Sequence, residues 1–126
     1  MAATPVAKLP EGDEWLYELK LDGYRALVLK MDDAVELRSR NDKNLTLMYP
    51  SVTAAARRIT ARKAVIDGET VALNAEGRPS FQALQHRSSH PSHRIVFYAF
   101  DLLHLDGEDL TERYMEIGRA SCRERV

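Results

Sequence analysis

The chain has 126 residues, of which 44% are hydrophobic, and its formal charge is −1. This length and apolar content suit one domain with its own core, and the near-neutral charge excludes the overall basic excess by which many compact nucleic-acid binders hold phosphates. The sequence has no apolar run long enough to span a membrane and no signal-peptide pattern, and its single cysteine, Cys122, has no partner for an internal disulfide, so we expect a cytoplasmic protein without membrane contacts.

The first forty residues predict an irregular lead-in followed by three strands. Residues 1–13 are polar and contain proline, which favours irregular structure. Strands are predicted over residues 15–20, 24–31 and 34–40, with Asp32 and Asp33 in the hairpin turn between the last two. Apolar and polar residues alternate over residues 35–38, which is typical of a half-buried antiparallel strand.

The next segment predicts a helix. After Pro50, Ser51 is expected to cap a helix that runs to about Arg62. The apolar residues of this segment recur at helical spacing and would face the core together; they are Val52, Ala55, Ala56 and Ile59.

The remaining elements alternate between strand and helix. Residues 64–73 predict a strand, residues 74–77 a turn, and Ser80 is expected to cap a short helix to about Arg87. Residues 94–103 predict an apolar, aromatic strand, and Asp106 and Gly107 the turn after it. Strand hairpins with intervening helices predict an α+β fold of mostly antiparallel sheets flanked by helices.

The hexapeptide Lys20-Leu21-Asp22-Gly23-Tyr24-Arg25 is the candidate for chemistry. It places a lysine amine beside a tight Asp-Gly turn between two predicted strands, where the side chain can face a cleft. A free lysine is almost fully protonated at neutral pH, and a nearby cation such as Arg25 favours the neutral amine that can attack phosphorus. The alternative is a surface hairpin with a Lys/Asp pair, because this short pattern is also common by chance.

Further segments resemble the nucleotidyltransferase domain of ATP-dependent DNA ligases, most closely the bacterial non-homologous end-joining type. Residues 9–25 resemble the first motif of that family with its lead-in. Ser39-Arg40-Asn41 with Thr46, Ile66-Asp67-Gly68-Glu69 and residues 97–103 resemble the motifs that follow. The resemblance covers about residues 5–115 and implies the ligase adenylation fold, in which the nucleotide lies between two sheets.

The resemblance also implies roles for individual residues. Lys20 would be the nucleophile that becomes adenylated. Five further residues would contact the nucleotide: Glu18 the adenine edge, Arg25 and Arg40 ribose and phosphate oxygens, Glu69 the ribose hydroxyls, and Phe100 the adenine face by stacking. The alternatives are surface charges at Glu18 and Arg40, a plain strand glutamate at Glu69, and core packing for Phe100 together with Phe97 and Tyr98.

Three small or acidic motif residues are expected to shape the site. Gly23 would give the turn its backbone freedom, and Gly68 would let its strand approach the ligand. Asp22 is expected to orient the turn or assist at the nick, and the alternative is an ordinary Asx turn.

The implied reaction is the joining of nicks or ends in double-stranded DNA. The expected cofactors are ATP and Mg²⁺, the latter held chiefly by phosphates and waters, and an end-binding protein is a candidate partner at the bacterial nucleoid during repair. The protein-bound metal ligands stay unassigned, and the histidines His86, His90, His93 and His104 lack the usual zinc spacing. The alternatives are an RNA ligase, an mRNA-capping nucleotidyltransferase, or an inert fragment that only binds nucleotide or DNA.

The resemblance ends before the later motifs of the family. Residues 116–126 match a translation of a common sequencing-library adapter, so we expect a non-native tail; the alternative is a native basic helix. The predicted organisation is therefore a lead-in (1–13), an N-terminal part of an adenylation domain (14–115) and this tail (116–126). The glutamate and lysine motifs expected later in the family would be missing, as would its oligonucleotide-binding domain.

Overall fold

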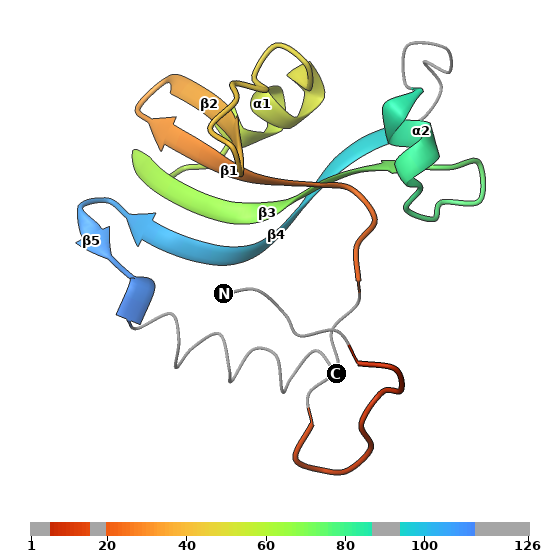
Figure 1. Cartoon of the computed structure of the whole chain (residues 1–126). Coiled ribbons are helices and arrows are strands. Elements are labelled where there is room, and N and C mark those ends of the chain that lie inside the picture. Colours follow the sequence, from red (N-terminus) through yellow and green to blue (C-terminus); the bar gives the residue numbers. More distant parts are fainter. Residues whose placement is uncertain (1–5, 16–19, 87–93, 113–126) are drawn as a thin grey trace.

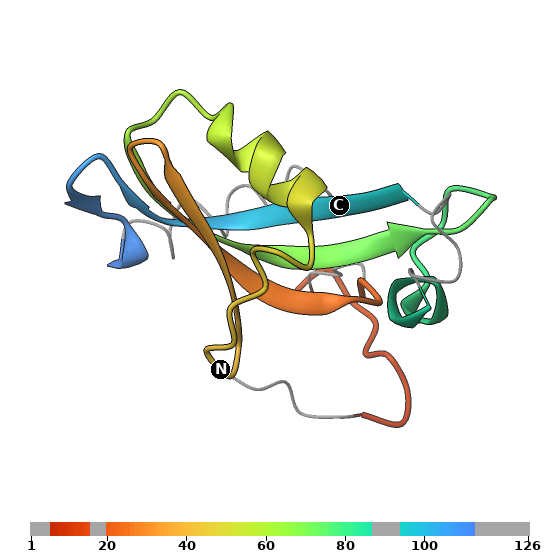
Figure 2. The same cartoon turned by 90° about the horizontal axis from the view of Figure 1, so that it is seen from above.

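A computed structural model describes residues 6–15, 20–86 and 94–112. These residues form an antiparallel sheet of five strands in the order β2-β1-β3-β4-β5. The strands are β1 (Tyr24–Met31), β2 (Ala34–Ser39), β3 (Lys63–Leu73), β4 (Arg94–Leu105) and β5 (Glu108–Asp109), and the helices are α1 (Pro50–Arg57) and α2 (Phe81–Gln85). Helix α1 lies across one face of the sheet and α2 lies where β3 ends (Figures 1 and 2). The predicted α+β class with antiparallel strands is confirmed.

The hairpin of β1 and β2 forms where the sequence predicts it. Val28 pairs with Leu37, and Met31 with Ala34. Asp32 takes a left-handed φ of 53°, which short polar side chains tolerate, and its amide donates to the Arg62 carbonyl at 2.6 Å. Strand β2 ends at Ser39, one residue before the predicted end, so Arg40 lies in the following turn.

Helix α1 is shorter than predicted, and its first turn differs. Pro50 opens the helix, because its fixed φ suits the first position and its missing N–H is not needed there. The capping position is Tyr49, whose side chain makes no cap bond, so the prediction of Ser51 as the cap is wrong. The hydroxyl of Thr53 instead donates to the Pro50 carbonyl at 3.0 Å.

The helix ends at Arg57 and not at Arg62. Lys30 of β1 is only 6% exposed, and its Nζ donates to the Arg57 carbonyl at 3.1 Å. A cation at the helix C-terminus satisfies a carbonyl that the ended helix leaves without an internal partner. Beyond this point the chain turns back toward β3.

The inward face of α1 is partly as predicted. Val52 and Ala56 are buried, and Thr53 is buried beside them. Ala55 is exposed and Ile59 is 36% exposed. Both instead line an open, mostly apolar cavity of about 390 Å³ between α1 and the sheet, and no predicted site residue lines it.

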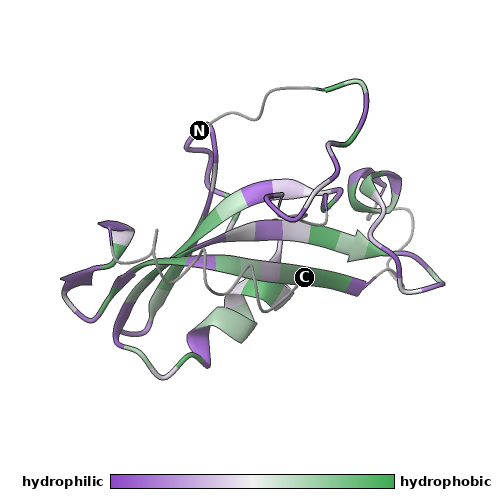
Figure 3. Cartoon of the chain, turned by 90° about the horizontal axis from the view of Figure 1, so that it is seen from below, coloured by the Kyte–Doolittle hydropathy of each residue, from purple (hydrophilic) through white to green (hydrophobic). Residues whose placement is uncertain are grey.

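The core lies between α1 and the sheet and extends under α2. Its buried members come from β1, β2, β3, both helices and the loop before α1; they are Ala26, Val28, Val35, Leu37, Leu45, Tyr49, Val52, Ala56, Ala72, Ala83 and Leu84. Alternate residues of a strand point to opposite faces, so Ala26 and Val28 face α1 while Arg25 and Leu27 face the other side. We call this other side the open face. Figure 3 shows hydrophilic and hydrophobic residues alternating along the strands in the view from below.

The pairing of β3 with β4 contains two irregularities. Asp67 pairs with Asp101 while Gly68 pairs with Ala99, so Phe100 is an extra residue in β4. A second shift, between Val65 and Ile66, leaves Leu103 extra. Such bulges redirect side chains, and the bulge at Phe100 sets the direction of its ring.

The elements at the two ends of the sheet largely follow the prediction. The Ser80 hydroxyl accepts from the Ala83 amide at 3.2 Å and caps α2, which ends at Gln85. Strand β4 runs two residues beyond its predicted end, and the Asp106-Gly107 turn leads into β5, which the sequence did not predict. Of the predicted strand over 15–20, residues 16–19 lie outside the described residues, and Trp15 and Lys20 are not in a strand.

Candidate active site

The turn before β1 is tied to β3 by one hydrogen bond. The amide of Gly23 donates to Oε1 of Glu69 at 3.0 Å, across 46 residues of sequence. In the register of the two strands, Arg25 faces Glu69 directly, so the carboxylate reaches the chain just before β1 begins. The lysine-bearing hexapeptide and the Asp67-Gly68-Glu69 segment are thereby brought together.

The same turn is also anchored to α2. Oδ2 of Asp22 accepts a hydrogen bond from the Phe81 amide at 3.3 Å. Phe81 is the first residue of α2, and the first amides of a helix have no partner within the helix. The rings of Tyr24 and Phe81 meet edge to face with centroids 5.2 Å apart. Asp22 therefore anchors the turn to a helix, which fits the expectation that it orients the turn.

Gly23 is required for space. A Cβ at this position would lie 2.1 Å from the Thr70 carbonyl oxygen and 2.7 Å from Cγ1 of Val71. Its φ is not in the left-handed region, so the expectation of special backbone freedom is replaced by one of close approach. Any side chain here would push the turn away from β3.

Arg25 is held by Asp67 on the open face. Its Nε donates to Oδ1 at 2.7 Å and its Nη2 to Oδ2 at 2.5 Å, a two-pronged pair that suits the planar guanidinium. The side chain of Asp67 is 13% exposed and that of Arg25 is 53% exposed. The hydrogen bond with Asp67 raises the pKa of Arg25; burial opposes this, and the charges of Asp67, Asp101 and Glu69 add to it.

The Phe100 ring completes this cluster. The Cζ atom of Arg25 lies 4.7 Å from the centroid of the ring, within the range of a cation–π contact. The bulge at Phe100 brings the ring to the guanidinium, although Asp67 itself pairs with Asp101. Arg25, Asp67, Glu69 and Phe100 thus come together from three strands, and we call these four residues the open-face cluster.

Three of the predicted site residues lie outside this cluster or outside the described residues: Lys20, Glu18 and Arg40. Lys20 is exposed, and it lies three residues before Gly23, whose amide donates to Glu69. No hydrogen bond or ion pair joins its amine to the residues that the structure describes. Glu18 lies outside the described residues.

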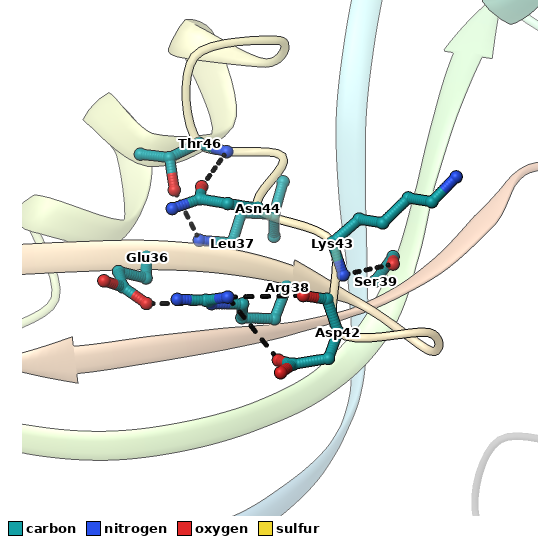
Figure 4. Close-up of polar contacts among 8 residues, drawn as sticks. All are labelled: Glu36, Leu37, Arg38, Ser39, Asp42, Lys43, Asn44 and Thr46. Atoms are coloured by element: carbon teal, nitrogen blue, oxygen red, sulfur yellow. Dashed lines mark hydrogen bonds and ion pairs between the residues drawn. The ribbon is translucent and has the colours of Figure 1, made fainter.

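Arg40 lies at the same end of the sheet as the cluster but is exposed. Ser39 pairs with Ala26, so Arg40 follows at the end where Arg25 stands. Figure 4 shows the turn that carries it: the Lys43 amide donates to the Ser39 hydroxyl at 3.0 Å, and Arg38 contacts Glu36 at 2.9 Å. Within the described part of the chain, no contact joins Arg40 to the open-face cluster.

Thr46, which the sequence groups with Arg40, closes this turn. Its Oγ1 accepts from the Leu37 amide at 3.0 Å, and its own amide donates to Oδ1 of Asn44 at 3.0 Å. The backbone amide of buried Leu37 in β2 thus finds its hydrogen-bond acceptor in a threonine nine residues later.

Gly68 has a packing role on the face toward α1. A Cβ there would lie 2.4 Å from Cζ of Phe97 and 2.4 Å from the Tyr98 carbonyl oxygen. The missing side chain therefore makes room for Phe97, which packs against the core. The expected purpose of Gly68, room for the ligand, is not the one that this geometry supports.

Asp67 is the site residue that the sequence analysis missed. It stands two residues before Glu69, and on a strand this spacing places both carboxylates on one face. That signal was present in the Asp-Gly-Glu pattern. Only the pairing of β1 with β3 shows that the partner of Asp67 is Arg25.

The cluster is acidic and offers donors and acceptors of particular kinds. The charges of Asp67, Asp101 and Glu69 act on the one guanidinium of Arg25. Because carboxylates accept hydrogen bonds and repel anions, the cluster suits ligand hydroxyls and amines better than phosphate oxygens. Across the described ranges, no three His, Cys, Asp or Glu side chains gather so that they could hold a metal ion.

The helices of the described part carry no membrane signal. Neither α1 nor α2 combines the length and apolar character that a membrane-crossing helix requires.

Comparison with known proteins identifies the family. Residues 2–125 match the family model described as "ATP dependent DNA ligase domain". A multifunctional non-homologous end joining DNA repair protein LigD of Mycobacterium tuberculosis is 43% identical over 100 residues, which are 79% of this chain and 13% of that protein. The LigD of Pseudomonas aeruginosa is 40% identical over 119 residues, 94% of this chain and 14% of that protein.

A solved structure has the same fold. A mycobacterial DNA ligase D in complex with ATP and MES superposes with a TM-score of 0.69 at 39% identity, covering 86% of this chain and 36% of that one. The chain thus spans well under half the length of these relatives. The residues that match the family model, 2–125, include the sheet that carries the open-face cluster.

Proposed function

The chain belongs to the ATP-dependent DNA ligase domain family, and from this premise we propose that it is part of an adenylation domain that joins nicks or ends in double-stranded DNA. Lys20 is the proposed nucleophile. The observation that carries the proposal is the hydrogen bond from Gly23 to Glu69, because it brings the lysine-bearing turn to the cluster of Arg25 and Phe100. The complex of a related ligase with ATP supports the choice of nucleotide.

The proposed reaction has three displacements. The neutral amine of Lys20 attacks the α-phosphorus of ATP; the N–P bond forms, the bond to the β-phosphate breaks, pyrophosphate leaves and the amine loses a proton. A DNA 5′-phosphate oxygen then attacks the same phosphorus and releases the amine. The 3′-hydroxyl finally attacks the 5′-phosphorus, loses its proton and releases AMP.

The open-face cluster is the proposed binding place for the nucleoside end of ATP. Glu69 already accepts the Gly23 amide through Oε1, and its second oxygen is the proposed acceptor for a ribose hydroxyl. Phe100 is the proposed stacking surface for adenine. Arg25, Arg40 and Glu18 stay proposed contacts to the nucleotide, as the resemblance implies.

Mg²⁺ is the proposed metal of the reaction and would neutralise charge on the phosphates when bound. The described residues supply no cluster of ligands for it. The chain's own part is to position the amine and the nucleoside.

The proposed partners and place follow from the relatives. The two LigD relatives are named for non-homologous end joining, which supports DNA ends as the proposed substrate. An end-binding protein as partner and the nucleoid in the cytoplasm as location are further proposals, which the resemblance implies. The boundaries 14–115 and 116–126 also stay predictions. Genomic sequence past the codon for residue 115 tests them, and continuation into further ligase motifs is the expected result.

The test is covalent labelling with α-labelled ATP and Mg²⁺, followed by denaturing electrophoresis. The wild-type chain is expected to carry label that Lys20→Ala abolishes, while Lys43→Ala, which removes another exposed lysine, keeps it. Absence of label together with nucleotide binding would mean an inert fragment. Label from GTP in place of ATP would indicate capping-type chemistry.

A further inference from the structure

The open-face cluster contains an ion pair whose purpose the proposed reaction leaves unexplained. Asp67 is largely buried, and both of its carboxylate oxygens accept hydrogen bonds from Arg25, at 2.7 and 2.5 Å. The directly opposite partner of Arg25 in the sheet is Glu69, not Asp67. One oxygen of Glu69 accepts the Gly23 amide, and Arg25 reaches diagonally to Asp67.

This diagonal reach determines where the guanidinium lies. Because Nε and Nη2 are both fixed by one carboxylate, the guanidinium plane has little freedom to turn. It is held with Cζ 4.7 Å from the centroid of the Phe100 ring. The ring itself sits on a bulge, where its direction is not fixed by regular pairing alone.

The charges around Arg25 argue against a role in binding phosphates. The charges of three carboxylates, those of Asp67, Asp101 and Glu69, all raise the pKa of Arg25, and Asp67 also contacts its guanidinium directly. A phosphate approaching Arg25 would meet this excess of negative charge. A neutral adenine ring or a ribose hydroxyl would not.

We infer that Asp67 is a positioning residue that fixes Arg25 against Phe100, so that Arg25 serves the nucleoside end of the substrate and not its phosphates. This inference rests on the proposed function, since it takes Phe100 as the surface for adenine. Asp67 contacts no substrate atom in this assignment. It acts by keeping the guanidinium and the ring in one arrangement before the nucleotide arrives.

The first test compares two ligands by calorimetry on the whole chain. Asp67→Asn is expected to weaken binding of ATP and of adenosine by the same factor, on the order of tenfold, because the defect lies at the nucleoside. Arg25→Gln is expected to do the same, and the double variant to be no worse than either single one, since both remove one unit. Glu36→Gln is the matched control: it breaks an exposed pair with Arg38 on the same sheet and is expected to change neither affinity.

Two outcomes of this comparison overturn the inference. Loss of ATP affinity with adenosine unchanged would make Arg25 a phosphate ligand. Unchanged affinity for ATP and adenosine in Asp67→Asn would show that Asp67 does not position Arg25 for binding.

A second measurement does not depend on nucleotide binding. In the NMR spectrum, the side-chain N–H of Arg25 is expected to show a ring-current shift from Phe100, which disappears in both Phe100→Leu and Asp67→Asn. Persistence of the shift in Asp67→Asn overturns the inference. If the shift depends on Asp67 but the wild-type chain binds neither ATP nor adenosine, the positioning stands and the proposed function fails.

Discussion

The carboxylate of Glu69 accepts the backbone N–H of Gly23 at 3.0 Å, and this bond fastens the turn that carries the proposed nucleophile to the middle of the sheet. Arg25 and Gly23 lie on either side of Tyr24, so the same short stretch of chain is held by Glu69 at one residue and by Asp67 at another. The position of the lysine-bearing turn is therefore a property of β3, more than 40 residues away in sequence.

The first prediction tests this bond. Glu69→Ala is expected to lower the free energy of unfolding by about 1–2 kcal/mol, because the Gly23 amide loses a charged acceptor. Glu69→Gln is expected to cost clearly less, since its amide oxygen can still accept. Urea denaturation measures both, and hydrogen exchange at the Gly23 amide should accelerate in Glu69→Ala only. Equal exchange in the two variants would show that the bond does not hold the turn.

The second prediction concerns the space at Gly23. Gly23→Ala places a Cβ 2.1 Å from the Thr70 carbonyl oxygen, and we expect a loss of about 2–3 kcal/mol and reduced adenylation at Lys20. Gly77→Ala is the control, because its Cβ meets nothing within 4 Å and only its φ of +76° is unfavourable. Its cost should be about 1 kcal/mol, with labelling unchanged. A Gly23→Ala chain as stable as Gly77→Ala would contradict the close approach.

The third prediction concerns Gly68 and Phe97. Gly68→Ala is expected to destabilise the chain by about 2–3 kcal/mol, since its Cβ meets both the Phe97 ring and the Tyr98 carbonyl at 2.4 Å. Adding Phe97→Leu should recover part of the loss, because the ring can be shortened but the backbone oxygen stays. Thermal unfolding of the two variants and of Phe97→Leu alone gives the coupling. Purely additive effects would mean that the ring does not fill the place of the missing side chain.

The fourth prediction concerns Thr46. Thr46→Val keeps the shape but removes the oxygen that accepts the Leu37 amide at 3.0 Å, and Leu37 is fully buried. An amide left without a partner there should cost about 1–3 kcal/mol. Thr46→Ser retains the hydroxyl and is the matched control. If urea midpoints fall equally for valine and serine, altered packing at position 46 is responsible and the loss of the hydrogen bond is not.

Much of the fold could be predicted because its signals are local. The alternation over residues 35–38 in β2, the Asp-Asp and Asp-Gly turns, and Ser80 before α2 each depend on residues within a few positions of one another. The error at the end of α1 lies where a distant residue intervenes. Helix α1 ends early at a carbonyl bound by Lys30 from β1, a contact that no helical pattern contains.

The candidate site divides in the same way. The sequence by itself determined which chemistry-bearing groups are present, from Lys20 to Glu69 and Phe100, because motif spacing is written along the chain. Only the tertiary structure decided how they are joined. Strand pairing and a bulge bring Arg25 into contact with Asp67 and Phe100, and they bring the Gly23 amide to Glu69. The physical reason is that hydrogen bonds and ring contacts depend on distance in space. The pairing of β1, β3 and β4 sets that distance for the site residues, whose contacts join positions 42 to 75 apart in the chain.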